Sequence, residues 1–144
     1  MNKNVSNLDI NKLRDESATI GGRWKPVDCA PKFKTAIIIP LKNEYLDNEY
    51  HLTFIYHMHM FLRKQKLNYG IYFMTMDPAN IEMMFNKGIL ANAGYREALG
   101  EQDYDCIIFH DIDMIPVNEQ NIYECNSEHP IRLASYSSFK FSKE

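Results

Sequence analysis

The sequence predicts an α/β fold built on a mostly parallel sheet. Three short apolar runs with the character of buried strands alternate with two segments whose apolar residues recur at helical spacing. The order strand, helix, strand, helix, strand is typical of a parallel sheet with helices flanking its faces. The chain has 144 residues, which is enough for one domain with a substantial core.

The first predicted elements follow a polar lead-in. Residues 1–22 carry no sustained apolar periodicity and end in Gly21-Gly22, so we expect a flexible tail. Residues 34–40, "KTAIIIP", form a β-branched run that is too short for a helix and predicts a fully buried strand. Residues 48–64 repeat large apolar side chains at helical spacing and predict a helix.

Two further strands and a second helix are predicted downstream. Residues 69–75, "YGIYFMT", and residues 104–110, "YDCIIFH", predict strands. The segment 85–100 between them predicts a helix, with Gly100 as its C-terminal stop. Ligands of parallel α/β sheets bind at the carboxyl ends of the strands. Polar clusters follow the first and third predicted strands, so we expect a binding site at that edge.

Composition excludes several functional classes. The net charge of −3 argues against a nucleic-acid binder, which would carry an excess of basic residues. We expect no transmembrane segment and no signal peptide, because the chain has no long apolar stretch and begins with polar residues. Three cysteines are too few for a disulfide-based scaffold.

Asp111 and Asp113 follow the third predicted strand. In an extended chain, residues two apart point the same way, so both carboxylates would face one side. Two neighbouring carboxylates stay ionised together only where a cation or several hydrogen-bond donors lie between them. Hard divalent cations such as magnesium or manganese prefer these oxygen ligands. The plain alternative is a solvated turn after the strand, with Asp113 capping whatever element comes next, and the buried strand before the pair favours a metal site.

The acidic pair leaves two enzyme classes open. In phosphatases of the haloacid dehalogenase type, a strand ends in two such aspartates, and Asp111 would be the nucleophile. That family has threonine or valine two places after the second aspartate, where this chain has Ile115. Its motif also lies near the start of the domain. The second class is the nucleotide-sugar glycosyltransferases.

Several linked segments resemble the β1,4-galactosyltransferase family. "RWKPVDCAPKFKTAIIIPLKNE", "FNKGILANAGYREAL" and "YDCIIFHDIDMIP" stand in the family's order and spacing, within a match from about Arg23 to Phe141. The resemblance implies a GT-A (Rossmann-like) fold, a UDP-sugar donor, manganese as cofactor and the Golgi lumen as location. The implied reaction transfers galactose or N-acetylgalactosamine, with inversion, to a glycan acceptor of the N-acetylglucosamine type.

The resemblance also assigns donor-binding residues. Asp113 matches the metal ligand of the family's acidic motif. Lys42 and Glu44 stand where the family usually has arginines, so one charge is kept and the other is reversed. Ser138 and Lys140 stand where the family tends to have a segment with a donor-contacting lysine. The residues that match the donor site are Pro40, Leu41, Lys42, Phe85, Lys87, Asp111, Ile112 and Asp113.

The resemblance pairs Cys106 with Cys125 and leaves Cys29 free. Family members continue beyond the match with a "GWGGEDDD"-like segment that supplies the general base and the acceptor contacts. The resemblance therefore assigns no catalytic residue to this chain. It implies that the fold is apparently truncated and that residues 23–144 are the N-terminal half of a catalytic domain. A non-catalytic nucleotide-sugar-binding or interaction remnant is the alternative. His110 is expected to face away from the acidic pair and not to bind metal.

Overall fold

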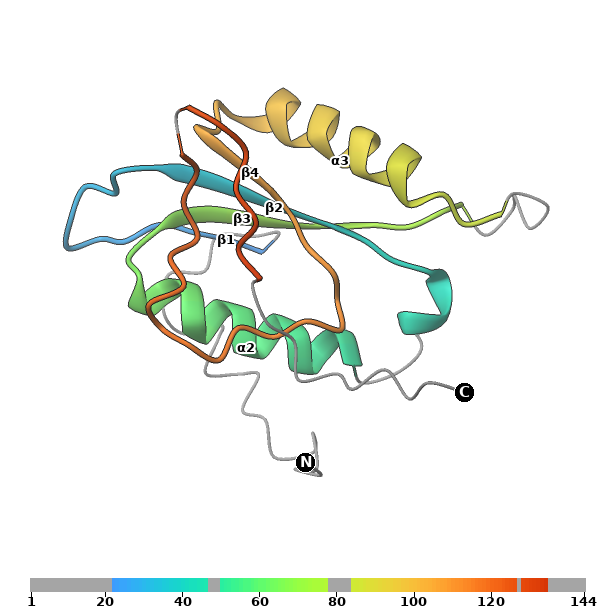
Figure 1. The fold of residues 1–144 in the computed structure, drawn as a ribbon, viewed down its shortest axis with the longest axis horizontal. Helices are drawn as coiled ribbons and strands as arrows, with labels where there is room; N and C mark the ends of the chain where they lie inside the picture. The colour runs from blue at the N-terminus through green and yellow to red at the C-terminus, as the bar shows by residue number, and fades with distance from the viewer. Residues whose placement is uncertain (1–21, 47–49, 78–83, 127, 135–144) are drawn as a thin grey trace.

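The computed structural model describes residues 22–46, 50–77, 84–126 and 128–134 (Figure 1). The central strand is β2 (Lys34–Pro40), with β3 (Asn68–Met74) and β4 (Cys106–Phe109) parallel to it on either side. The short strand β1 (Arg23–Trp24) pairs antiparallel with β3, so the sheet order is β1-β3-β2-β4. The predicted α/β class with a mostly parallel sheet is confirmed.

Burial of β2 explains its uninterrupted apolar sequence. Parallel neighbours lie on both sides of this strand and helices flank both faces of the sheet, so every residue of β2 except Lys34 is buried. A strand in this position needs apolar side chains at consecutive positions rather than at alternate ones. Because β2 and β4 are parallel and in register, with Ile38 opposite Phe109, their carboxyl ends lie side by side.

The two long helices cover opposite faces of the sheet (Figure 1). The main core lies between the sheet and α2 (Tyr50–Lys64). On the other face, α3 (Lys87–Glu101) packs against β2 and β3 through buried Leu90, Gly94 and Ala98. The largest fully buried side chains of the described residues are Tyr69, Phe54, Ile37, Ile38, Ile39, Leu41, Met58 and Leu62.

Some predicted boundaries were wrong. Gly100 does not stop α3, which continues to Glu101 and ends where the Gln102 amide donates to the Ala98 carbonyl at 3.2 Å. The third strand is shorter than predicted and ends at Phe109. The sequence did not predict β1, whose two residues form a strand only through their pairing with β3. The predicted tail lies almost wholly outside the described residues.

The segment after β4, orange to red in Figure 1, returns past the C-terminal end of α2. The Gln65 side chain holds it there, because Nε2 donates to the Asn121 carbonyl and Oε1 accepts from the Tyr123 amide, each at 3.0 Å. A disulfide between Cys106 and Cys125 ties the same segment to β4. No helix among the described residues has the length and apolarity to cross a membrane.

Candidate functional site

A cleft of about 260 Å³ lies at the carboxyl edge of the sheet, where β2 and β4 end and α3 begins. All eight residues that the resemblance assigns to donor binding line this cleft, and so does Tyr45, which the sequence did not single out. Tyr45 belongs to a short 3₁₀ helix, η2 (Asn43–Tyr45), that turns the chain away after β2. The lining residues are Pro40, Leu41, Lys42, Tyr45, Phe85, Lys87, Asp111, Ile112 and Asp113.

The acidic pair lies on a turn, not on an extended strand. The Met114 amide donates to the Asp111 carbonyl at 3.2 Å, which closes a four-residue turn with Ile112 and Asp113 at its centre. The premise that an extended chain aligns the two carboxylates was therefore wrong. Both aspartates nevertheless line the same cleft, because the turn follows directly after the end of β4.

Two lysines bring positive charge to the cleft. Lys87, the first residue of α3, forms an ion pair with Asp111. Lys42 Nζ lies 3.5 Å from Glu44 Oε1 just after the end of β2, and both side chains are exposed. The cleft therefore mixes cationic and acidic groups, and each lysine has a carboxylate partner beside it.

The N-terminus of α3 also faces this edge of the sheet. Asn86 caps the helix, since its side-chain oxygen accepts from the Ile89 amide at 3.0 Å. Phe85 and Lys87 on either side of the cap line the cleft. The positive end of the helix dipole is thus close to the two lysines and adds to the attraction for an anion.

His110 lies behind the acidic turn and faces the core. Its ring packs edge-on against Phe54 and stacks on Tyr123, with ring centroids 5.4 and 5.8 Å apart. Its Nδ1 lies 2.8 Å from the Asp111 carbonyl oxygen and its Nε2 lies 2.8 Å from the Tyr123 hydroxyl. Burial lowers the pKa of His110 and raises the pKa of Tyr123 to about 12, so a neutral imidazole meets a protonated phenol.

The metal donors of the cleft are the two aspartates. Within the part of the chain that the structure describes, no three His, Cys, Asp or Glu side chains gather in a way that would hold a metal ion. Asp111 is paired with Lys87, whereas the Asp113 carboxylate makes no ion pair or hydrogen bond with a described residue. Carboxylate oxygens suit a hard divalent cation, so the donor chemistry fits manganese and Asp113 is the more available ligand.

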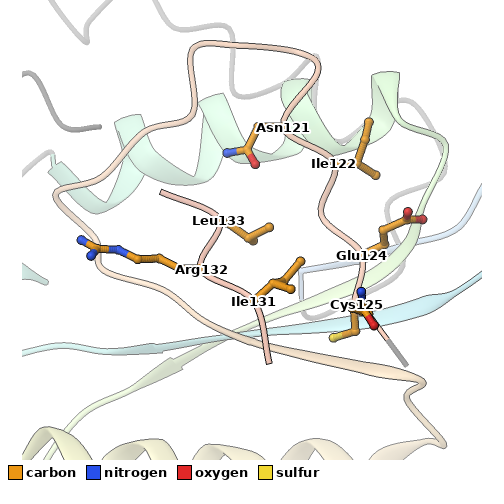
Figure 2. A pocket seen from close by; sticks show the side chains of 8 residues that line it. Asn121, Ile122, Glu124, Cys125, Ile131, Arg132 and Leu133 are labelled. Carbon is orange, nitrogen blue, oxygen red and sulfur yellow. The ribbon is translucent and has the colours of Figure 1, made fainter. Parts of the chain in front are cut away.

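A second hollow, of about 390 Å³, lies between residues 121–126 and 131–133 (Figure 2). Its lining has one cation, Arg132, and one carboxylate, Glu124. It gathers none of the residues that the resemblance assigns to the donor, although its lining includes the disulfide cysteine Cys125. We therefore place the candidate site in the smaller cleft. Ser138 and Lys140, which the resemblance also implicated, lie outside the described residues.

Comparisons with known proteins agree with the fold described above. The family model for the N-terminal region of glycosyl transferase group 7 matches residues 1–126. Bovine β-1,4-galactosyltransferase 1 is 38% identical over 135 residues, which cover 94% of this chain and 32% of that protein. Human β-1,4-galactosyltransferase 3 is 40% identical over 115 residues, which cover 79% of this chain and 28% of that protein. The chain thus spans about a third of the length of these relatives.

Solved structures show the same similarity. A mutant of Drosophila β1,4-galactosyltransferase 7, crystallised in complex with manganese, UDP-Gal and xylobiose, matches with a TM-score of 0.56 and 32% identity. The match covers 67% of this chain and 37% of that one. The catalytic domain of the same Drosophila enzyme in complex with xylobiose matches with a TM-score of 0.53 and 29% identity.

Proposed function

The chain belongs to glycosyl transferase group 7, and from this membership we propose that residues 23–144 are the donor-binding half of a galactosyltransferase-type catalytic domain. The donor would be a UDP-sugar carrying galactose or N-acetylgalactosamine, and the acceptor would be a glycan ending in an N-acetylglucosamine-type sugar. Transfer would invert the configuration at the anomeric carbon of the donor sugar. One observation supports this most directly: the cleft at the sheet edge gathers all eight residues that match the family's donor site.

The cleft supplies complementary charge for a nucleoside diphosphate. Lys42 lies between β2 and η2, and Lys87 begins α3, so the two ammonium groups can contact the diphosphate from separate segments. The capped N-terminus of α3 adds amide donors at the same edge. Asp111 restrains Lys87 through their ion pair and so limits the directions in which the ammonium group points. These groups bind and orient the donor.

We propose that Asp113 holds a manganese ion, with Asp111 beside it. When bound, such an ion neutralises charge that develops on the departing diphosphate. The role of Asp113 in this chain is then to fix the ion at the end of β4. The disulfide fits an oxidising compartment, which supports the Golgi lumen as the proposed location.

Calorimetry of UDP binding with and without manganese tests the proposal. The protein should bind UDP only when manganese is present, and Asp113→Asn should abolish that binding while the fold stays intact. Asp103→Asn is the matched control, because Asp103 is exposed and lies before the amino end of β4, at the opposite edge of the sheet. Equal affinity in the wild type and in Asp113→Asn would exclude the metal role.

A second candidate function is non-catalytic binding of a nucleotide sugar. The observation that favours it is the Lys42–Glu44 pair, since Glu44 offsets a cation at the edge where the donor phosphates would lie. Glu44→Arg removes this offset and should tighten manganese-dependent UDP binding. Glycan turnover by the wild type, measured with UDP-galactose and an N-acetylglucosamine acceptor, would exclude the non-catalytic role.

A further inference from the structure

We propose that His110 is a positioning residue for the acidic turn, and that it holds the Asp111 carbonyl so that Asp113 faces the cleft. The inference deepens the proposed function and rests on it for the meaning of Asp113. The contacts that support it lie behind the turn, between β4 and the segment that returns past α2.

The turn is held in place at the Asp111 carbonyl oxygen. This oxygen accepts two hydrogen bonds, one from the Met114 amide at 3.2 Å and one from His110 Nδ1 at 2.8 Å. The first bond closes the turn and the second ties it to the core. The peptide plane that carries this carbonyl leads into Ile112 and Asp113. Rotation of that plane would change the direction of the Asp113 side chain, so the imidazole restrains the proposed metal ligand.

The direction of each hydrogen bond assigns the tautomer of His110. A carbonyl oxygen can only accept, so Nδ1 must carry a proton and donate it to Asp111. In a neutral imidazole, Nε2 then has no proton and accepts from the Tyr123 hydroxyl. The Asp111 carbonyl therefore selects the tautomer, and the Tyr123 hydroxyl, which can donate or accept, completes it by donating to Nε2. A carboxylate or carbonyl often does this for a histidine that binds metal directly, whereas here the histidine acts through the backbone.

Tyr123 is itself held from several sides. It is only 2% exposed, and its ring packs edge-on against Phe61. Its amide donates to Gln65 Oε1 at 3.0 Å and its carbonyl accepts from Thr35 Oγ1 at 3.3 Å. A residue with this many fixed contacts gives His110 a rigid support, so the restraint on the acidic turn extends back to β2 and α2.

Two variants separate the proposed role from packing. His110→Phe keeps an aromatic ring of similar size against Phe54 but loses both nitrogens. His110→Asn restores an amide N–H at the same number of bonds from the backbone as Nδ1, so it can donate to the Asp111 carbonyl again. The matched control is His59→Phe. His59 is a buried histidine of α2 whose Nδ1 lies 2.6 Å from the Tyr69 hydroxyl. Tyr69 lies at the amino end of β3, away from the cleft.

Two measurements on each variant test the proposal. Hydrogen exchange of the Met114 amide, which needs no ligand, should accelerate in His110→Phe, return toward the wild-type rate in His110→Asn and stay unchanged in His59→Phe. The affinity for UDP in the presence of manganese should fall by about tenfold or more in His110→Phe and recover in His110→Asn.

The outcomes are distinguishable. Unchanged Met114 exchange in His110→Phe would overturn the proposal, as would an equal acceleration in His59→Phe or a failure of His110→Asn to slow the exchange. Faster exchange in His110→Phe with no manganese-dependent UDP binding by the wild type would support the positioning role and overturn the proposed function. Faster exchange together with weaker UDP binding in this one variant would support both.

Discussion

At the scale of single residues, we expect Lys87 to serve the proposed donor site rather than the stability of the fold. Its side chain is 55% exposed and that of its partner Asp111 is 37% exposed, so their ion pair contributes little to folding. We expect Lys87→Gln to weaken manganese-dependent UDP binding by about tenfold and to leave the melting temperature nearly unchanged. Lys64→Gln is the control, because it removes a comparably exposed pair with Glu119 beyond the cleft. A similar loss of affinity in both variants would argue against a specific contact.

His59 should give the protein a dependence of stability on pH. Burial lowers the pKa of His59 from its usual value of 6.5 to about 4. The unfolded chain therefore binds a proton at His59 more readily than the folded chain does. The stability that this residue contributes is complete above about pH 6.5 and falls by at most about 3 kcal/mol as the pH drops toward 4. Urea unfolding at pH 7 and about pH 4.5 should show the fall. His59→Gln should reduce it, whereas the exposed His57→Gln should not.

At the scale of elements, the close packing of α3 against the sheet depends on Gly94. A Cβ atom there would lie 2.5 Å from Ile38 Cγ2 and 2.7 Å from Met74 Cγ, so alanine would push the helix away from β2 and β3. Gly94→Ala should lower the free energy of unfolding by about 1–3 kcal/mol, although alanine favours helix. Gly100→Ala is the matched control, because nothing lies within 4 Å of a Cβ there. It should stabilise the protein by up to about 1 kcal/mol in urea unfolding. Stabilisation by both changes would contradict the close approach.

The sequence predicted an element well where burial determines its residue pattern. It predicted a feature less well where contacts with residues distant in the sequence determine it. The predicted bounds 34–40 match β2, because only a strand covered on both faces needs an apolar residue at every position. Gly100 misled the prediction by one residue, because α3 continues through Glu101 and ends where the Gln102 amide donates to the Ala98 carbonyl. The turn at 111–114 was only the alternative in the prediction, which favoured an extended acidic pair. The hydrogen bonds that fix the turn come from the Met114 amide and from His110, and His110 is held in turn by Tyr123, 13 positions downstream.

At the scale of the whole molecule, the candidate site depends on three segments that are far apart in the sequence. The end of β2, the start of α3 and the turn after β4 meet because the parallel strands align their carboxyl ends. A general rule for α/β sheets thus predicts a cleft at this edge from the sequence alone. The rule did not predict Tyr45 or the pairing of Lys87 with Asp111, which depend on side-chain directions.

The disulfide joins β4 to the returning segment and should contribute to the stability of the whole molecule. It links Cys106 to Cys125, 19 positions apart, and closes a loop that contains the entire acidic turn. Loop-closure entropy for that size predicts a loss of about 3 kcal/mol in the free energy of unfolding for the double variant Cys106→Ala/Cys125→Ala. Cys29→Ser is the control, since Cys29 is a free and exposed thiol, and its loss should leave stability unchanged. Thiol titration of the unfolded, unreduced protein should find one thiol, and three thiols would contradict the bond. The double variant should also accelerate hydrogen exchange of the Met114 amide. Tyr123, which holds His110 behind the turn, lies two residues before Cys125, so loss of the disulfide should loosen its position.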